Sequence, residues 1–142
     1  MSNDDRIKVL LDAVELQQSQ LGRKPRASYE TNAIFRYDDK RHLNINTVKN
    51  PNVLVEALAF LLEKQARSQE AAGLLDVSLS TFQWNGYSTE DYANDFKRRI
   101  EIINFAVRKT KLDATKKKLK TLVSEEARTG MELDEIADLL QS

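Results

Sequence analysis

The longest helical pattern in the sequence constrains the fold most, because residues 88–129 carry two apolar stripes that face different directions. Side chains on one face of an α-helix recur every three or four positions. The first stripe consists of Tyr92, Phe96, Ile100, Ile103 and Val107. The second is rotated from it by roughly 150° and consists of Phe105, Leu112, Leu119 and Val123. One straight helix cannot bury both stripes against one partner, so either the chain breaks near Thr110 or a long helix packs against two partners.

The second stripe is typical of a coiled-coil seam, since Phe105, Leu112 and Leu119 follow one another every seven residues. We therefore interpret this seam, with Val123, as a candidate contact with a protein partner or with a second copy of the chain, which would make a homo-oligomer. The alternative is that a final helix over residues 131–141 covers it.

The remaining segments predict a mixture of helices and strands. An N-terminal helix over 3–21 is expected from the capping residue Ser2 or Asn3 and from Gly22 after it. Period-two alternation predicts a β-hairpin over 28–48. Asn50 and Pro51 begin a helix over 51–72, and helices follow over 89–128.

The stretch 76–84 fits either a third strand or a loop, and residues 88–129 fit one helix or two. Taken together, the pattern predicts an α+β single domain over 1–142, in which an N-terminal helix and a β-hairpin pack with three or four further helices and the C-terminal half is rich in helix.

Charge and composition exclude several classes of protein. The 22 basic and 22 acidic residues give a net charge of zero, which excludes nucleic-acid binding through bulk charge alone. No cysteine is present, which excludes thiol catalysis and disulfides. No apolar run approaches the ~18–20 residues needed to span a bilayer, and the acidic start is unlike a secretory signal. We expect a cytoplasmic protein that does not enter membranes.

A second candidate surface lies on the hairpin and on the loop that holds the single tryptophan. Its polar, basic and aromatic side chains could bind nucleic acid, a nucleotide or another small anionic ligand. These residues are Arg36, Lys40, Arg41, Asn44, Asn46, Trp84 and Tyr87. The alternative is that the polar groups form a solvated strand face and that the aromatic rings cap the core.

Catalysis and cofactor binding have no supporting motif. The sequence lacks a glycine-rich phosphate loop, a His-Glu-x-x-His pattern and a nucleophile elbow. The single histidine, His42, cannot build a metal site of its own. We therefore predict no catalytic, cofactor or metal residues, and expect a non-enzymatic interaction or regulatory protein acting by protein–protein contact or self-association. The hairpin and Trp84 loop leave open a nucleic-acid or nucleotide-binding module.

The C-terminal half resembles small uncharacterised accessory proteins of tailed bacteriophages. The resemblance rests on the run from Trp84 to Tyr92, on the run from Phe96 to Ile100, and on the stretch from Leu112 to the region of Leu133. It implies an accessory factor that acts in the bacterial host cytoplasm, and it assigns no functional residue.

Overall fold

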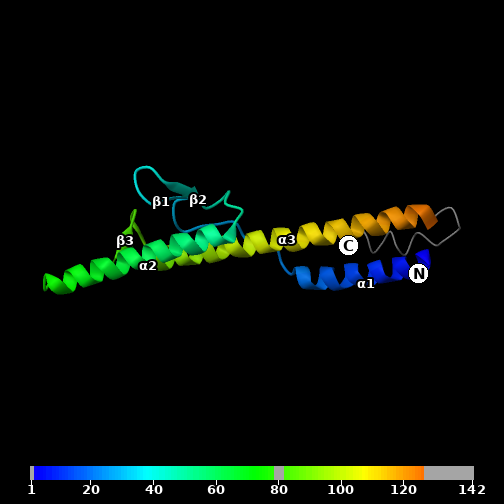
Figure 1. Cartoon of the computed structure of the whole chain (residues 1–142), viewed down its shortest axis with the longest axis horizontal. Coiled ribbons are helices and arrows are strands. Elements are labelled where there is room, and N and C mark those ends of the chain that lie inside the picture. Colours follow the sequence, from blue (N-terminus) through cyan, green and yellow to red (C-terminus); the bar gives the residue numbers. More distant parts are fainter. Residues whose placement is uncertain (1, 79–81, 127–142) are drawn as a thin grey trace. The chain divides into compact units, whose positions relative to one another are not determined.

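The computed structural model describes residues 2–78 and 82–126, and these form a helix-rich α+β protein, as predicted (Figure 1). The helices are α1 (Asn3–Leu21), α2 (Pro51–Leu74) and α3 (Thr89–Glu126). The strands are β1 (Ile34–Arg36), β2 (His42–Asn44), β3 (Gln83–Trp84) and β4 (Tyr87–Ser88). By contact pattern the described residues form two compact units, residues 2–23 with 105–126 and residues 24–78 with 82–104.

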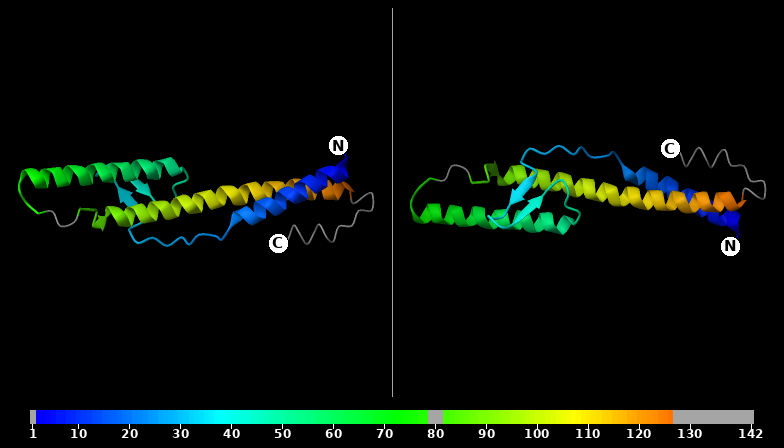
Figure 2. Two further views of the ribbon diagram at one scale, coloured as in Figure 1. Left: turned by 90° about the horizontal axis from the view of Figure 1, so that it is seen from below. Right: turned by 90° about the horizontal axis from the view of Figure 1, so that it is seen from above.

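The first unit is an antiparallel pair made by α1 and the second part of α3 (Figures 1 and 2). One guanidinium nitrogen of Arg108 donates a hydrogen bond of 3.2 Å to the carbonyl oxygen of Leu21, so the end of α1 lies beside the beginning of this part of α3. The buried core of the pair consists of Ile7, Val14, Leu21, Leu112, Leu119 and Val123. On both helices large side chains recur every seven residues, which is the spacing that keeps a seam facing its partner.

The second unit contains α2, the first part of α3 and two small antiparallel hairpins. Strand β1 pairs with β2, with Phe35 opposite Leu43, and β3 pairs with β4, with Trp84 opposite Tyr87. The fully buried side chain of Phe35 lies edge-on to the rings of Tyr92 and Phe96 at centroid distances of 5.0 and 5.6 Å. The buried core of this unit consists of Phe35, Ile45, Leu54, Ala57, Leu61, Tyr92 and Phe96.

Capping side chains explain where the helices begin. The hydroxyl of Ser2 accepts a hydrogen bond from the backbone N–H of Asp5, and the side-chain oxygen of Asn50 accepts one from Asn52. At the start of α3, Ser88 and Asp91 exchange hydrogen bonds between side chain and backbone N–H. These contacts satisfy donors that the first turn of a helix leaves unpaired. The three helices begin at Asn3, Pro51 and Thr89, each directly after its capping residue.

Several predicted boundaries differ from the structure. The expected hairpin over 28–48 has paired strands only at 34–36 and 42–44. The stretch 76–84, for which strand and loop were both left open, has strand only at Gln83–Trp84 among its described residues. Helix α2 ends at Leu74 rather than at residue 72, because Gly73 keeps a helical conformation and Asp76 supplies the left-handed residue with φ of 53°.

The two-stripe segment is one continuous helix from Thr89 to Glu126, so it does not break near Thr110. Its first stripe packs in the core of the second unit, except Val107, which is 51% exposed. Its second stripe packs against α1. The final helix predicted over 131–141 lies outside the described residues. Since α3 contributes to both units, the number of independently folding domains stays a prediction.

Candidate functional site

The predicted seam on α3 is already filled by another helix of the same chain. Leu112 and Leu119 are fully buried, Val123 is 9% exposed, and Phe105 is partly buried against the same cluster. Their neighbours are the α1 side chains Ile7, Val14 and Leu21. Among the described residues, the helix that covers the seam is therefore α1.

A surface pocket of about 670 Å³ lies between the first hairpin and the turn after β3. Its lining consists of Ile34, Arg36, Tyr37, Asp38, Asp39, Arg41, His42, Trp84 and Asn85. Of the residues predicted for a ligand or nucleic-acid surface, the structure brings together Arg36, Arg41 and Trp84. The other four predicted residues, which do not line this pocket, are Lys40, Asn44, Asn46 and Tyr87.

Those four have other surroundings. The Asn44 side chain accepts a hydrogen bond from the backbone N–H of Asn46, which is a local turn contact. The ring of Tyr87 lies 5.8 Å from that of Tyr92 and packs on the core. Lys40 is an exposed residue of the hairpin turn. The predicted surface is therefore only partly assembled.

The charges in the pocket largely cancel one another. The Asp38 carboxylate lies 3.3 Å from the Arg41 guanidinium, and that guanidinium also lies 5.3 Å from the centre of the Tyr37 ring. Backbone N–H groups of Lys40 and Arg41 donate to Asp38 and hold its pKa below the usual 3.8. Two arginines and two aspartates thus line the pocket, and Arg36 and Asp39 have no ion-pair partner among the described residues.

The pKa values of Tyr37 and Asp38, which both line this pocket, are shifted away from pH 7. Burial raises the pKa of the Tyr37 phenol above 10.0, the Glu56 carboxylate raises it further, and Arg41 opposes both. The pKa of Asp38 moves in the opposite direction, below 3.8. General acid–base catalysis works best when the pKa lies near the operating pH. Both shifts move these groups away from that condition.

Trp84 and Asn85 attach the second hairpin to the first. The indole N–H of Trp84 and the amide of Asn85 both donate to the carbonyl oxygen of Arg36, at 2.6 and 2.9 Å. Asn85 and Gly86 have φ angles of 51° and 88°, which are typical of the two central residues of a tight hairpin turn. Sequence reasoning missed this hairpin, although an Asn-Gly pair is a strong signal for one.

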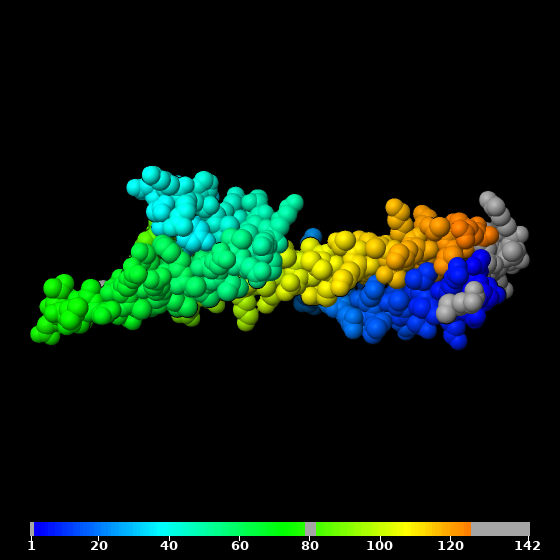
Figure 3. Space-filling view, viewed as in Figure 1, coloured from blue at the N-terminus to red at the C-terminus, as the bar shows by residue number. Residues whose placement is uncertain are grey.

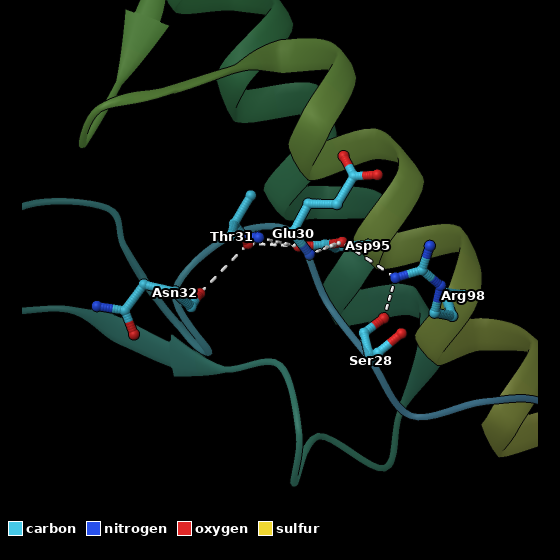
Figure 4. Close-up of polar contacts among 6 residues, drawn as sticks. All are labelled: Ser28, Glu30, Thr31, Asn32, Asp95 and Arg98. Atoms are coloured by element: carbon cyan, nitrogen blue, oxygen red, sulfur yellow. Dashed lines mark hydrogen bonds and ion pairs between the residues drawn. The ribbon is translucent and has the colours of Figure 1, made fainter.

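A buried carboxylate, Asp95, fixes the segment before β1 to α3 (Figure 4). It is fully buried and accepts hydrogen bonds from the backbone N–H groups of Glu30 and Thr31, at 3.0 and 2.9 Å, and from the Thr31 hydroxyl. Arg98 lies 3.7 Å from Asp95 and donates to the carbonyl oxygen of Ser28. Asp95 does not line the pocket, and its partners give it a structural role that no local sequence signal indicates.

An uncovered apolar surface lies along α2 and the turn that follows it. Leu62 of this helix is 49% exposed, while Leu54 and Leu61 are fully buried. Large apolar side chains with the same exposure or more lie one on the first turns of the helix and three at its end and in the turn that follows. They are Val55 at 58%, Leu74 at 82%, Leu75 at 73% and Val77 at 57%. Figure 3 shows that the second half of α2, in green, stands clear of the first hairpin, in cyan.

Three residues without large side chains complete a stripe on the exposed face of α2. We call the exposed set Val55, Ala59, Leu62, Ala66 and Gly73 the outer stripe. Residues seven apart in a helix differ by only about 20° in direction. Ala59, Ala66 and Gly73 therefore form one row and Val55 and Leu62 another beside it. This stripe lies on the side of α2 away from the buried Ala57 and Leu61.

The turn after α2 has a defined backbone geometry. The N–H of Val77 donates to the carbonyl oxygen of Ala72, and the N–H of Asp76 donates to that of Gly73. With Asp76 in the left-handed conformation, this is the Schellman arrangement that terminates many helices. The exposed Leu74, Leu75 and Val77 are thus held by backbone hydrogen bonds at the end of α2.

Comparisons with known protein families, with curated proteins and with solved structures found no match. In residues 2–78 and 82–126 no helix is both long and apolar enough to cross a membrane. Within those same ranges no group of three or more aspartate, glutamate or histidine side chains could hold a metal ion.

Proposed function

We propose that this chain is a non-enzymatic interaction protein that contacts a partner protein through the outer stripe of α2 and the apolar turn after it. One observation carries the proposal: along α2 and in the turn after it, four large apolar side chains are about half exposed or more, namely Leu62, Leu74, Leu75 and Val77. Single exposed apolar residues are normal on a protein surface, whereas contiguous groups mark interaction sites.

The position of these side chains supports a contact with a partner rather than a role in folding. The core of the second unit takes its α2 residues from the first half of the helix, between Leu54 and Leu61. The second half of α2 contributes none of the side chains of that core. Replacing the exposed leucines by polar residues would therefore cost the free chain little stability. A partner that covers them would stabilise the complex by about 25 cal/mol per Å² of apolar surface buried.

The resemblance of the C-terminal half to small proteins of tailed bacteriophages supports an accessory role in the bacterial cytoplasm. In that setting the chain would act by binding another protein and changing the contacts which that protein makes. The seam on α3 would serve to hold α1 in place.

The experiment compares affinity capture from native cells by the parent, by a Leu62→Asp, Leu74→Asp variant, and by a Val107→Asp control. Val107 is 51% exposed and lies on α3, outside the proposed surface. We expect a partner that is retained by the parent and the control and is lost by the α2 variant, with circular dichroism unchanged in all three. A set of captured proteins that is the same for all three would contradict the proposal.

A second candidate function is the binding of a nucleotide or single-stranded nucleic acid in the hairpin pocket. The observation that favours it is that Trp84 lines the same pocket as Arg36, which has no ion-pair partner among the described residues. Trp84 is the single tryptophan, so its fluorescence reports on this site alone. Salt-dependent quenching by an oligonucleotide, lost in an Arg36→Ala variant, would support this function; unchanged fluorescence would remove it.

A further inference from the structure

We propose that the partner seated on the outer stripe of α2 is an α-helix with lysine or arginine beside its apolar seam, and not a second copy of this chain. This inference rests on the proposed function and specifies its partner. It is carried by the arrangement of charge beside the stripe and by the small residues within it.

The outer stripe has an acidic side and an uncharged side. Glu56, Glu63 and Glu70 recur every seven residues, about 60–100° around the helix from the centre of the stripe. All three are exposed. On this side the one basic residue is Arg67, which pairs with Glu63 at 2.7 Å, so the acidic residues remain in excess.

The other side of the stripe is neutral. The residues there are Leu58, Gln65 and Gln69. Lys64 lies on the far side of α2, where its ammonium group is 5.5 Å from the centre of the Phe60 ring. A partner helix that lies on the stripe would thus meet carboxylates along one of its edges. Complementary lysine or arginine residues would be favoured there, as at the flanking positions of coiled coils.

The small residues of the stripe favour a helix as the occupant. Ala59, Ala66 and Gly73 form a row one heptad apart, with no side chain larger than a methyl group. A β-carbon added at Gly73 would meet no atom within 4 Å, and the backbone there is helical, so nothing within the chain requires glycine at this position. Rows of small residues let two helix backbones approach closely, which a partner helix would use.

A second copy that pairs its own outer stripe with this one does not satisfy this arrangement. A twofold axis that pairs two outer stripes in antiparallel orientation places the acidic edge of one copy beside the acidic edge of the other, which is repulsive. Pairing in parallel places the carboxylates beside neutral residues. Neither arrangement supplies the opposite charge.

The C-terminal segment of the chain does not supply it either. Residues 131–141 include four acidic residues and no basic one. A helix from this segment would bring carboxylates to the edge formed by Glu56, Glu63 and Glu70. The charge pattern therefore selects a separate basic helix.

The test uses two synthetic peptides of about three heptads, each stapled to be helical, with the same leucine and alanine seam. One carries lysine at the flanking positions and the other carries glutamate. Binding is measured by fluorescence anisotropy to the full chain, to Leu62→Asp, to the control Val107→Asp, and to a triple variant with Glu56→Gln, Glu63→Gln and Glu70→Gln.

We expect the lysine peptide to bind the parent and the control at least about tenfold more tightly than the glutamate peptide. The triple variant should remove most of that preference, and Leu62→Asp should abolish binding of both peptides. Light scattering should give a monomer of 16.3 kDa at low and high salt.

Three results would overturn the inference, and they separate it from the proposed function. Equal binding of both peptides that depends on Leu62 refutes the basic partner but keeps the docking surface. Failure of both peptides, or binding that Leu62→Asp leaves unchanged, refutes the docking surface as well. A dimer that Leu62→Asp dissociates would identify a second copy as the occupant.

Discussion

Replacing Leu119 by alanine should destabilise the chain, whereas the same replacement at Leu62 should not. Leu119 is fully buried between α1 and α3, and Leu62 is half exposed on α2. Both lie within helices and both changes remove the same atoms. The comparison therefore isolates burial from helix propensity and from the chemistry of the side chain.

The magnitude follows from the packing around each residue. Buried leucine-to-alanine changes cost about 2–5 kcal/mol of unfolding free energy. The core around Leu119 is a single layer between two helices, which can partly close over a cavity, so we expect about 2–3 kcal/mol, near the lower end of that range. At the exposed Leu62 the change should stay within about 0.5 kcal/mol.

Urea unfolding followed by circular dichroism measures both changes. With a slope of about 1–3 kcal/mol per molar urea, the Leu119→Ala midpoint should fall by about 0.7–3 M. Amide hydrogen exchange adds a local readout: α1 amides should exchange faster in this variant, because α1 packs on Leu119. A Leu119→Ala variant as stable as the parent, or a Leu62→Ala variant as damaged, would refute the assignment of the seam to α1.

Three further predictions concern other parts of the second unit. Asp95→Ala leaves the backbone N–H groups of Glu30 and Thr31 without their carboxylate acceptor and should cost about 3 kcal/mol in urea unfolding; a loss below about 1 kcal/mol would contradict the structural role of this carboxylate. Gly73→Ala should raise the unfolding free energy by about 0.5–1 kcal/mol, because Gly73 is helical with open space around it, and a lowered midpoint would show that the position is strained. The pKa of Asp38 is lower in the folded chain than its usual 3.8, so the hydrogen bonds that it accepts are present above that pH and are lost as the pH falls through the folded value. The Lys40 amide signal in NMR should therefore titrate with a midpoint below 3.8, and a midpoint at or above it would contradict the turn geometry.

Local signals account for the parts of the fold that were predicted correctly. Helix starts at Ser2, Asn50 and Ser88 depend on hydrogen bonds between residues two or three apart, so the sequence alone reveals them. The buried side chains of α1 are evident from their spacing for the same reason. The Asn85-Gly86 turn is equally local, and its Asn-Gly pair is a sequence signal for a hairpin that the predictions did not use.

Contacts between distant residues account for what could not be predicted. The backbone N–H of Thr31 donates to the Asp95 carboxylate although the two residues are 64 positions apart, and no local sequence pattern indicates this contact. The seam of α3 was correctly recognised as an apolar row, but periodicity does not say which helix covers it. Leu62 follows the buried Leu61 directly, so only the observed packing of α2 shows that one is covered and the other exposed.

In the candidate site, too, residue types could be predicted from the sequence but the way they come together could not. The basic and aromatic residues Arg36, Arg41 and Trp84 were selected for their chemistry, and the structure gathers them around one pocket. The sequence did not reveal that Asp38 and Asp39 line it too and offset the charge. The outer stripe was missed because an exposed apolar row and a buried one have the same period.

Photo-cross-linking along α2 tests the central claim most directly. A photoreactive amino acid is placed singly at Ala59, Leu62 or Ala66 on the outer stripe, at Lys64 on the opposite side, and at Val107 on α3, and the protein is irradiated in its native cells. Our account predicts one common cross-linked product from the three stripe positions and none from Lys64 or Val107. Products of equal yield at all five positions, or a product from Val107 alone, would contradict the claim that the outer face of α2 binds the partner.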